Sequence, residues 1–197
     1  YCEEGRSVSQ HGLICGKQGG SIVKKIKCTL GTLHKAIAEI ESYQKELDEK
    51  VHTLMERLAE IGIEEATVRF ANAIYDGTND VRVNNTPVWI DKNKLAISAT
   101  GKSITFIEFG AGVHYAAESH PKAGDFGFTR GGYGYHLGKL DSWRYSGNPG
   151  TNGEVITEGK HQGEVKTYGN PANRALYDSA KKVREQITKI AEEVFGK

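Results

Sequence analysis

The chain has 197 residues, of which 38% are hydrophobic and 24 are glycine, so we expect one domain with a modest core and much loop. Its formal net charge of +1 argues against a dedicated nucleic-acid-binding protein, because such proteins usually carry a clear basic excess. The sequence has no apolar run long enough to span a membrane, and we expect no membrane partner.

The first residues of the chain differ in composition from the rest. Residues 1–21 are polar and glycine-rich, and they lack the apolar centre of a signal peptide. We expect residues 1–21 to be a disordered or expression-derived leader and residues 22–197 to form a single domain. The three cysteines match no metal-binding spacing and are expected to be incidental thiols of a protein made in a reducing cytoplasm. They are Cys2, Cys15 and Cys28.

A long amphipathic helix is predicted next. Apolar residues recur at spacings of three and four over residues 33–61, which places them on one helical face. The stripe consists of Leu33, Ile37, Ile40, Tyr43, Leu47, Val51, Leu54, Leu58 and Ile61. Thr32 is the expected N-cap and Gly62 the expected break. A second helix is expected over residues 64–75, closed by Asp76-Gly77.

The middle of the chain predicts short antiparallel strands. Residues 80–91 and 95–99 alternate apolar and polar side chains, with Pro87 marking an edge or a bulge. Residues 104–109 are densely apolar and predict a buried strand, and Gly110 and Gly112 predict a sharp turn, with positive φ at one of them at least. The expected fold is therefore α+β, with a long N-terminal helix and a C-terminal helix packed on a small antiparallel β meander.

A long Gly/Tyr-rich loop insertion is expected over residues 113–168, because more than half of the 24 glycines lie between residues 110 and 169. A hairpin is predicted from residues 154–157 and 164–168. Asn170-Pro171 then opens the last helix, whose inward residues would be Leu176, Ala180, Val183, Ile187, Ile190 and Val194. Interface candidates in the loop are Arg130, Tyr133, Tyr135, Trp143, Arg144 and Tyr145, since Tyr, Trp and Arg are the usual anchors of protein interfaces.

Known catalytic patterns are missing from the sequence. The histidines at positions 114, 120, 136 and 161 have no metal-ligand spacing and are expected to be solvated or packed in the loop. The glycines of residues 127–134 lack the Gly-Lys-Ser/Thr of a phosphate-binding loop. Nothing sets the distance between Glu108 and Glu118, so a carboxylate pair is not indicated. We therefore predict no catalytic, cofactor-binding or metal site, with a small enzyme or nucleic-acid-binding module using this Gly/Tyr/His-rich loop as the alternative.

Two short motifs resemble a known family. The run Phe106-Ile-Glu108-Phe109-Gly110-Ala-Gly112 resembles the aromatic-x-Glu-Phe/Tyr-Gly-Thr-Gly signature of small phage neck proteins. These are the tail-completion, or head–tail joining, proteins of long-tailed double-stranded DNA phages and prophages. Residues 169–173, Gly-Asn-Pro-Ala-Asn, look like the same family's proline-containing start of its last helix. The resemblance covers residues 26–197. It departs at residues 76–80, at residues 172–173 and in the length of the loop.

The resemblance implies a structural virion protein of the phage neck, not an enzyme and without a cofactor. It would complete the tail and join it to the head connector as part of a ring, usually of six copies. Its implied partners are copies of itself, connector or adaptor proteins, and tail-terminator or tail-tube proteins. Genome DNA would pass through the lumen without sequence-specific binding, and the protein would be made in the bacterial host cytoplasm. The structural signature residues are Glu108, Phe109, Gly110, Gly112 and Pro171. A tail terminator or minor capsid protein is the alternative within the structural class.

Overall fold

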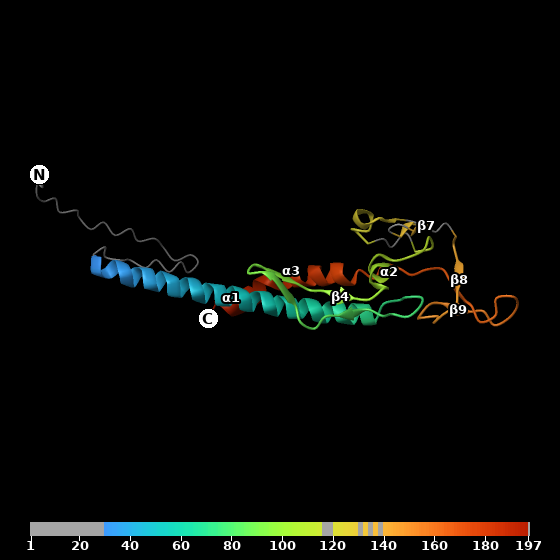
Figure 1. Cartoon of the computed structure of the whole chain (residues 1–197), viewed down its shortest axis with the longest axis horizontal. Coiled ribbons are helices and arrows are strands. Elements are labelled where there is room, and N and C mark those ends of the chain that lie inside the picture. Colours follow the sequence, from blue (N-terminus) through green and yellow to red (C-terminus); the bar gives the residue numbers. More distant parts are fainter. Residues whose placement is uncertain (1–29, 116–119, 130–131, 134–135, 138–139, 197) are drawn as a thin grey trace, which may run out of the picture. The chain divides into compact units, whose positions relative to one another are not determined.

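The computed structural model describes residues 30–115, 120–129, 132–133, 136–137 and 140–196. The predicted leader and the three cysteines lie outside these residues. The described part contains long helices and small antiparallel sheets, which confirms the α+β class (Figure 1). None of its helices is both long and apolar enough to cross a membrane. The chain divides into two compact units, residues 1–45 and residues 46–197.

Helix α1 (Leu30–Ala71) runs without interruption through the predicted break at Gly62. Thr32, the predicted N-cap, lies inside it. Gly62 is instead a close-packing position. A Cβ there would lie 2.4 Å from Ile97 Cδ1 and 3.0 Å from Val183 Cγ2, and the Ser179 hydroxyl donates to the Gly62 carbonyl at 2.6 Å. Tight tertiary packing thus outweighs the roughly 1 kcal/mol by which glycine disfavours a helix interior.

The apolar stripe of α1 has two different halves. Val51, Leu54, Leu58 and Ile61 are half-buried. The earlier members of the stripe are exposed, at 39–60% of their accessible surface: Leu33, Ile37, Ile40, Tyr43 and Leu47. The expectation that the long N-terminal helix packs on the meander is therefore wrong for the first half of its apolar stripe.

The predicted meander is one long hairpin with two paired sections. Strands β1 (Arg82–Val83) and β4 (Ala99–Thr100) pair at its base, and β2 (Val88–Asp91) and β3 (Lys94–Ala96) pair at its tip. Trp89 of β2 stacks on His52 of α1 with ring centroids 4.2 Å apart. The hairpin therefore packs along the second half of α1.

The predicted strand at residues 104–109 is a helix, α2 (Ile104–Phe109). The two residues before it are held from outside, because the Asp80 carboxylate accepts hydrogen bonds from the backbone N–H of Lys102 and from both the N–H and the hydroxyl of the N-cap residue Ser103. A six-residue apolar run has no period that separates a buried strand from a buried helix, so the sequence pattern could not decide between them.

The buried core lies where α1, the hairpin and α2 meet α3 (Ala175–Phe195). It consists of Phe70, Ala73, Val81, Ile107 and Ala175. The helix predicted after Pro171 is confirmed. Of its predicted inward residues, Ile190 is buried, Leu176, Val183 and Val194 are half-buried, and Ala180 and Ile187 are exposed. This small core holds the start of α3 beside the end of α2.

The predicted loop insertion contains short secondary structure. A 3-10 helix, η2 (Gly124–Phe126), leads into a sheet of β5 (Phe128–Thr129), β6 (Gly132–Tyr133) and β7 (His136–Leu137). A second sheet has the order β8-β10-β9, formed by β8 (Trp143–Tyr145), β9 (Glu154–Val155) and β10 (Val165–Thr167). The pairing of β9 with β10 confirms the predicted hairpin.

Candidate functional site

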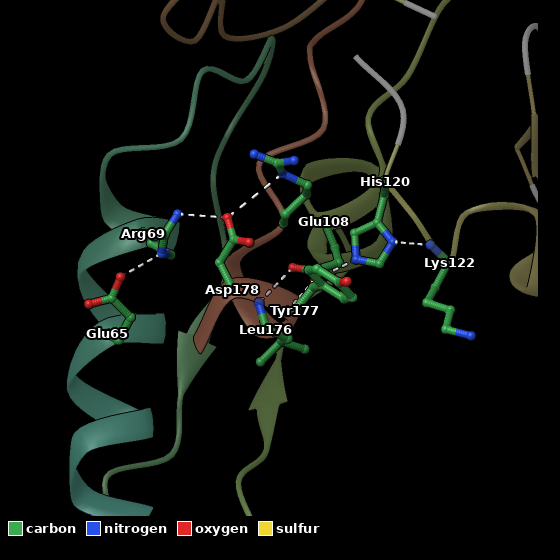
Figure 2. A network of polar contacts seen from close by, with 9 residues as sticks. Glu65, Arg69, Glu108, His120, Lys122, Leu176, Tyr177 and Asp178 are labelled. Carbon is green, nitrogen blue, oxygen red and sulfur yellow. Dashed lines mark hydrogen bonds and ion pairs between the residues drawn. The ribbon is translucent and has the colours of Figure 1, made fainter. Parts of the chain in front are cut away.

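The site begins with the poorly capped start of α3. Arg174, at the N-cap, has a left-handed backbone with φ 56° and makes no side-chain capping hydrogen bond. The N–H groups of a first helical turn need acceptors from elsewhere. Glu108 of α2 supplies them, since its Oε2 accepts the N–H of Leu176 and its Oε1 the N–H of Tyr177, both at 2.9 Å (Figure 2). Glu108 thus caps α3 across the fold.

The capping is reciprocal. The last carbonyl groups of a helix also lack partners within it. In α2, the carbonyl of Ile107 accepts the N–H of Asn173 at 2.9 Å, and that of Glu108 accepts the N–H of Arg174 at 3.1 Å. The Asn170 side chain donates to the carbonyl of Phe106 at 2.9 Å. The end of α2 and the start of α3 therefore satisfy each other, and we call this contact the α2–α3 junction.

His120 completes the junction. Its Nδ1 accepts the N–H of Lys122 at 2.9 Å, so the ring proton lies on Nε2, which is 3.2 Å from Oε1 of Glu108 (Figure 2). His120 is 5% exposed and Glu108 4%. The rings of Phe109 and Tyr177 contact the imidazole edge to face. Of the two expected states of His120, solvated or packed in the loop, the structure shows the packed one, with Glu108 as its buried partner.

Gly110 and Gly112 bring the chain after α2 against the chain before α3. Their φ angles are 80° and 96°, as predicted for these positions. Between them, Ala111 exchanges two backbone hydrogen bonds with Asn170, of 3.0 and 2.9 Å. A Cβ on Gly110 would lie 2.8 Å from Ala172 N, and one on Gly112 would lie 2.6 Å from Tyr168 O. Only glycine fits where the two backbone segments lie this close. After this contact the chain continues through Pro171 to the start of α3.

Two further contacts tie neighbouring segments to the junction. Arg69 of α1 bridges Glu65, at 2.7 Å, and Asp178 in the first turn of α3, at 3.0 Å (Figure 2). An acidic residue in this turn also interacts favourably with the helix dipole. Phe109 stacks on Phe126 and Phe128, which fastens the start of the insertion to α2.

The interface candidates divide into two groups. Trp143, Arg144 and Tyr145 form β8, whose backbone pairs with β10. The Tyr145 hydroxyl donates to the carbonyl of Asn148 at 2.7 Å, whereas Arg144 is exposed beside Glu164. Arg130 and Tyr135 lie outside the described residues. Tyr133 belongs to β6, but its side chain is not among those described.

Asp76 is a residue whose role the sequence did not indicate. The Thr167 hydroxyl donates to its Oδ2 and also accepts the N–H of Gly169. Its Oδ1 is buried and has no hydrogen-bond partner within the described part of the chain. Burial raises the pKa of Asp76 to about 6. The sequence predicted only that Asp76 ends a helix, because its partner lies 91 residues away.

The chemistry of the α2–α3 junction is that of a structural joint. Both carboxylate oxygens of Glu108 already accept hydrogen bonds, and its imidazole partner is enclosed by aromatic rings. Within the described residues, no group of three or more His, Cys, Asp or Glu side chains could hold a metal ion. His161 lies near the carboxylate of Glu164, and His114 lies near that of Asp141.

No protein-family model, curated protein or solved structure matches the chain significantly.

Proposed function

We propose that the chain is a structural virion protein of the phage neck, which completes the tail and joins it to the head connector as a subunit of a ring. The observation that supports this most is where the signature-like run lies. Residues 106–112 resemble the family signature, and they are the residues whose cap, carbonyls and glycines make the α2–α3 junction. A short sequence motif supports a family resemblance better when its residues form one structural contact, and residues 106–112 do so here.

The proposal assigns the contacts with neighbouring neck proteins to the insertion, residues 113–168. Ring subunits need two different faces that fit each other head to tail. Gly- and Tyr-rich segments supply adaptable backbone together with large contact area. Arg144 is exposed on β8 and is the described candidate for such a contact. Amide exchange in the insertion should be fast in the free subunit and slow in the particle.

The test removes the gene for this chain from the genome that encodes it and induces particle formation. DNA-filled heads and separate tails should accumulate in electron micrographs, and a wild-type copy should restore joined particles. A copy with Arg144→Glu should join fewer heads and tails than a copy with Arg184→Glu, a matched charge change on α3. Tails of irregular length or defective heads would instead indicate a terminator or minor capsid protein. Normal infectious particles would overturn a virion role.

A further inference from the structure

The first part of α1 carries an apolar surface with a repeat of seven. We call residues 33–45 of α1 the arm (Figure 1, blue). In heptad notation, Leu33 and Ile40 occupy d positions, while Ile37 and Gln44 occupy a positions. The exposed fraction of the residue is 49% for Leu33, 46% for Ile37 and 60% for Ile40. A row of large apolar side chains so exposed is unusual unless a partner covers it.

We infer that the arm associates with the arms of other copies of this chain, in parallel and in register, as a short coiled coil. The spacing of three and four is the pattern that lets a and d side chains of one helix insert between those of another. A second copy presents the same spacing by construction, whereas an unrelated partner would need to match it. Ile37 and Ile40 at neighbouring a and d positions favour three strands over two.

Gln44 sets the direction of the pairing. Its side chain carries both donors and an acceptor, so two such side chains facing each other satisfy one another. In a parallel, in-register bundle, Gln44 of one copy faces Gln44 of the next. In an antiparallel pair that keeps Ile37 opposite Ile40, Gln44 would face Leu33, and a polar group would be buried without a partner. A single polar a position is a known determinant of register.

The charges of the arm permit self-association. Residues 33–45 contain two lysines, Lys35 and Lys45, and two glutamates, Glu39 and Glu41, so copies do not repel each other through a net charge. A helical segment of this length is only marginally stable alone in water. Contact with other arms would therefore stabilise the arm's helix as well as bury its apolar face. This inference does not depend on the neck function, since it concerns the purified chain alone.

The test uses the full chain with Cys2, Cys15 and Cys28 replaced by serine. In that background, Gln44→Cys should form disulfide-linked dimers under mild oxidation, because parallel register brings the two positions together. Ser42→Cys, on the opposite face of the same helical turn, is the matched control and should cross-link far less. Adding Ile37→Asn and Ile40→Asn should weaken association in sedimentation experiments by at least about a hundredfold, through loss of two buried apolar side chains.

Three results would overturn the inference, the last of them through its parallel register. One is a chain that sediments as a monomer up to high micromolar concentration. Another is equal cross-linking of the Gln44→Cys and Ser42→Cys variants, which would indicate random collision. If association persists but Gln44→Cys fails to cross-link, the parallel register is wrong. Circular dichroism of each variant establishes that the rest of the fold is intact.

Discussion

The Oε2 atom of Glu108 lies 2.9 Å from the backbone nitrogen of Leu176, which is 68 residues further along the chain. A carboxylate on one short helix thus does the work that a Ser, Thr, Asp or Asn would do at the N-cap of another. The same carboxylate accepts the N–H of Tyr177 and faces His120 in a buried environment.

Glu108→Ala should therefore be strongly destabilising, by about 3–5 kcal/mol, because two charge-assisted hydrogen bonds are lost and a buried histidine loses its partner. Glu108→Gln should cost less, since the amide keeps one acceptor. The control is Glu193→Ala, which removes a part-exposed ion pair with Arg57 and should change stability by no more than about 1 kcal/mol. Denaturant unfolding measures all three. Equal effects of the two alanine variants would show that the cap contributes little.

Gly112→Ala should destabilise the protein much more than Gly163→Ala. Both glycines have positive φ, of 96° and 86°, which costs an L residue about 1–2 kcal/mol. Around Gly163 there is open space for a Cβ, whereas at Gly112 it would lie 2.6 Å from the carbonyl oxygen of Tyr168. Forcing that contact should add about 1–3 kcal/mol, measured as a difference in unfolding midpoints. Similar midpoints for the two variants would contradict the close approach.

Asp76 should make the protein more stable as the pH falls from 8 to 5. Its pKa in the folded state is about 6, above the ordinary value of 3.8, so folding favours the protonated carboxyl. This contribution is fully present below pH 3.8 and is lost as the pH rises through 6. Asp76→Asn should remove that dependence, and the control Asp125→Asn, at an exposed position, should keep it. Melting temperatures from pH 4.5 to 8 provide the measurement.

Asp80 should contribute with the opposite sign. Its pKa is lowered to about 2, chiefly by the Ser103 hydroxyl and then by the N–H groups of Lys102 and Ser103. The stabilisation is present above pH 3.8 and is lost as the pH falls through 2. The stability difference between wild type and Asp80→Asn should stay constant from pH 8 to 5 and shrink below pH 4. Acid titration followed by circular dichroism measures this stability difference. A difference that grows below pH 4 would contradict the role given to Asp80.

The two halves of the α1 stripe should respond differently to truncation. Leu58 is half-buried against the rest of its unit, so Leu58→Ala should cost about 1–3 kcal/mol. Ile40 is 60% exposed, and Ile40→Ala should change the stability of the dilute monomer by less than about 0.5 kcal/mol. Thermal unfolding at low protein concentration separates them. A large effect at Ile40 under those conditions would mean that this side chain is core.

The parts of the fold that the sequence predicted are those with local signals. The start of α3 after Pro171, the hairpin of β9 and β10 and the positive φ of Gly110 and Gly112 follow from residues that are neighbours in the chain. Proline and glycine restrict or free the backbone wherever they stand, so their effect needs no distant partner. The same holds for the apolar spacing of α1 and α3.

The wrong predictions concern residues whose role is set by distant partners. Distant partners hold both sides of residues 104–109, because Asp80 binds the two residues just before the helix and residues 173–174 donate to its last carbonyls, and neither is visible in the run itself. Gly62 looks like a helix end in sequence, but its lack of a side chain serves the approach of Val183 and Ile97. Likewise, nothing near His120 or Asp76 in sequence points to Glu108 or Thr167.

The reciprocal capping of α2 and α3 also has a consequence for biosynthesis. Ala175 completes the buried cluster around Ile107 and Phe70, and it is made only after the whole insertion of residues 113–168. A nascent chain that has emerged as far as the insertion therefore exposes this apolar surface and leaves Glu108 without its helix. Contacts of such large sequence separation slow folding. Ribosome-bound intermediates should bind chaperones until α3 is released, and stop codons before residue 175 should yield insoluble fragments.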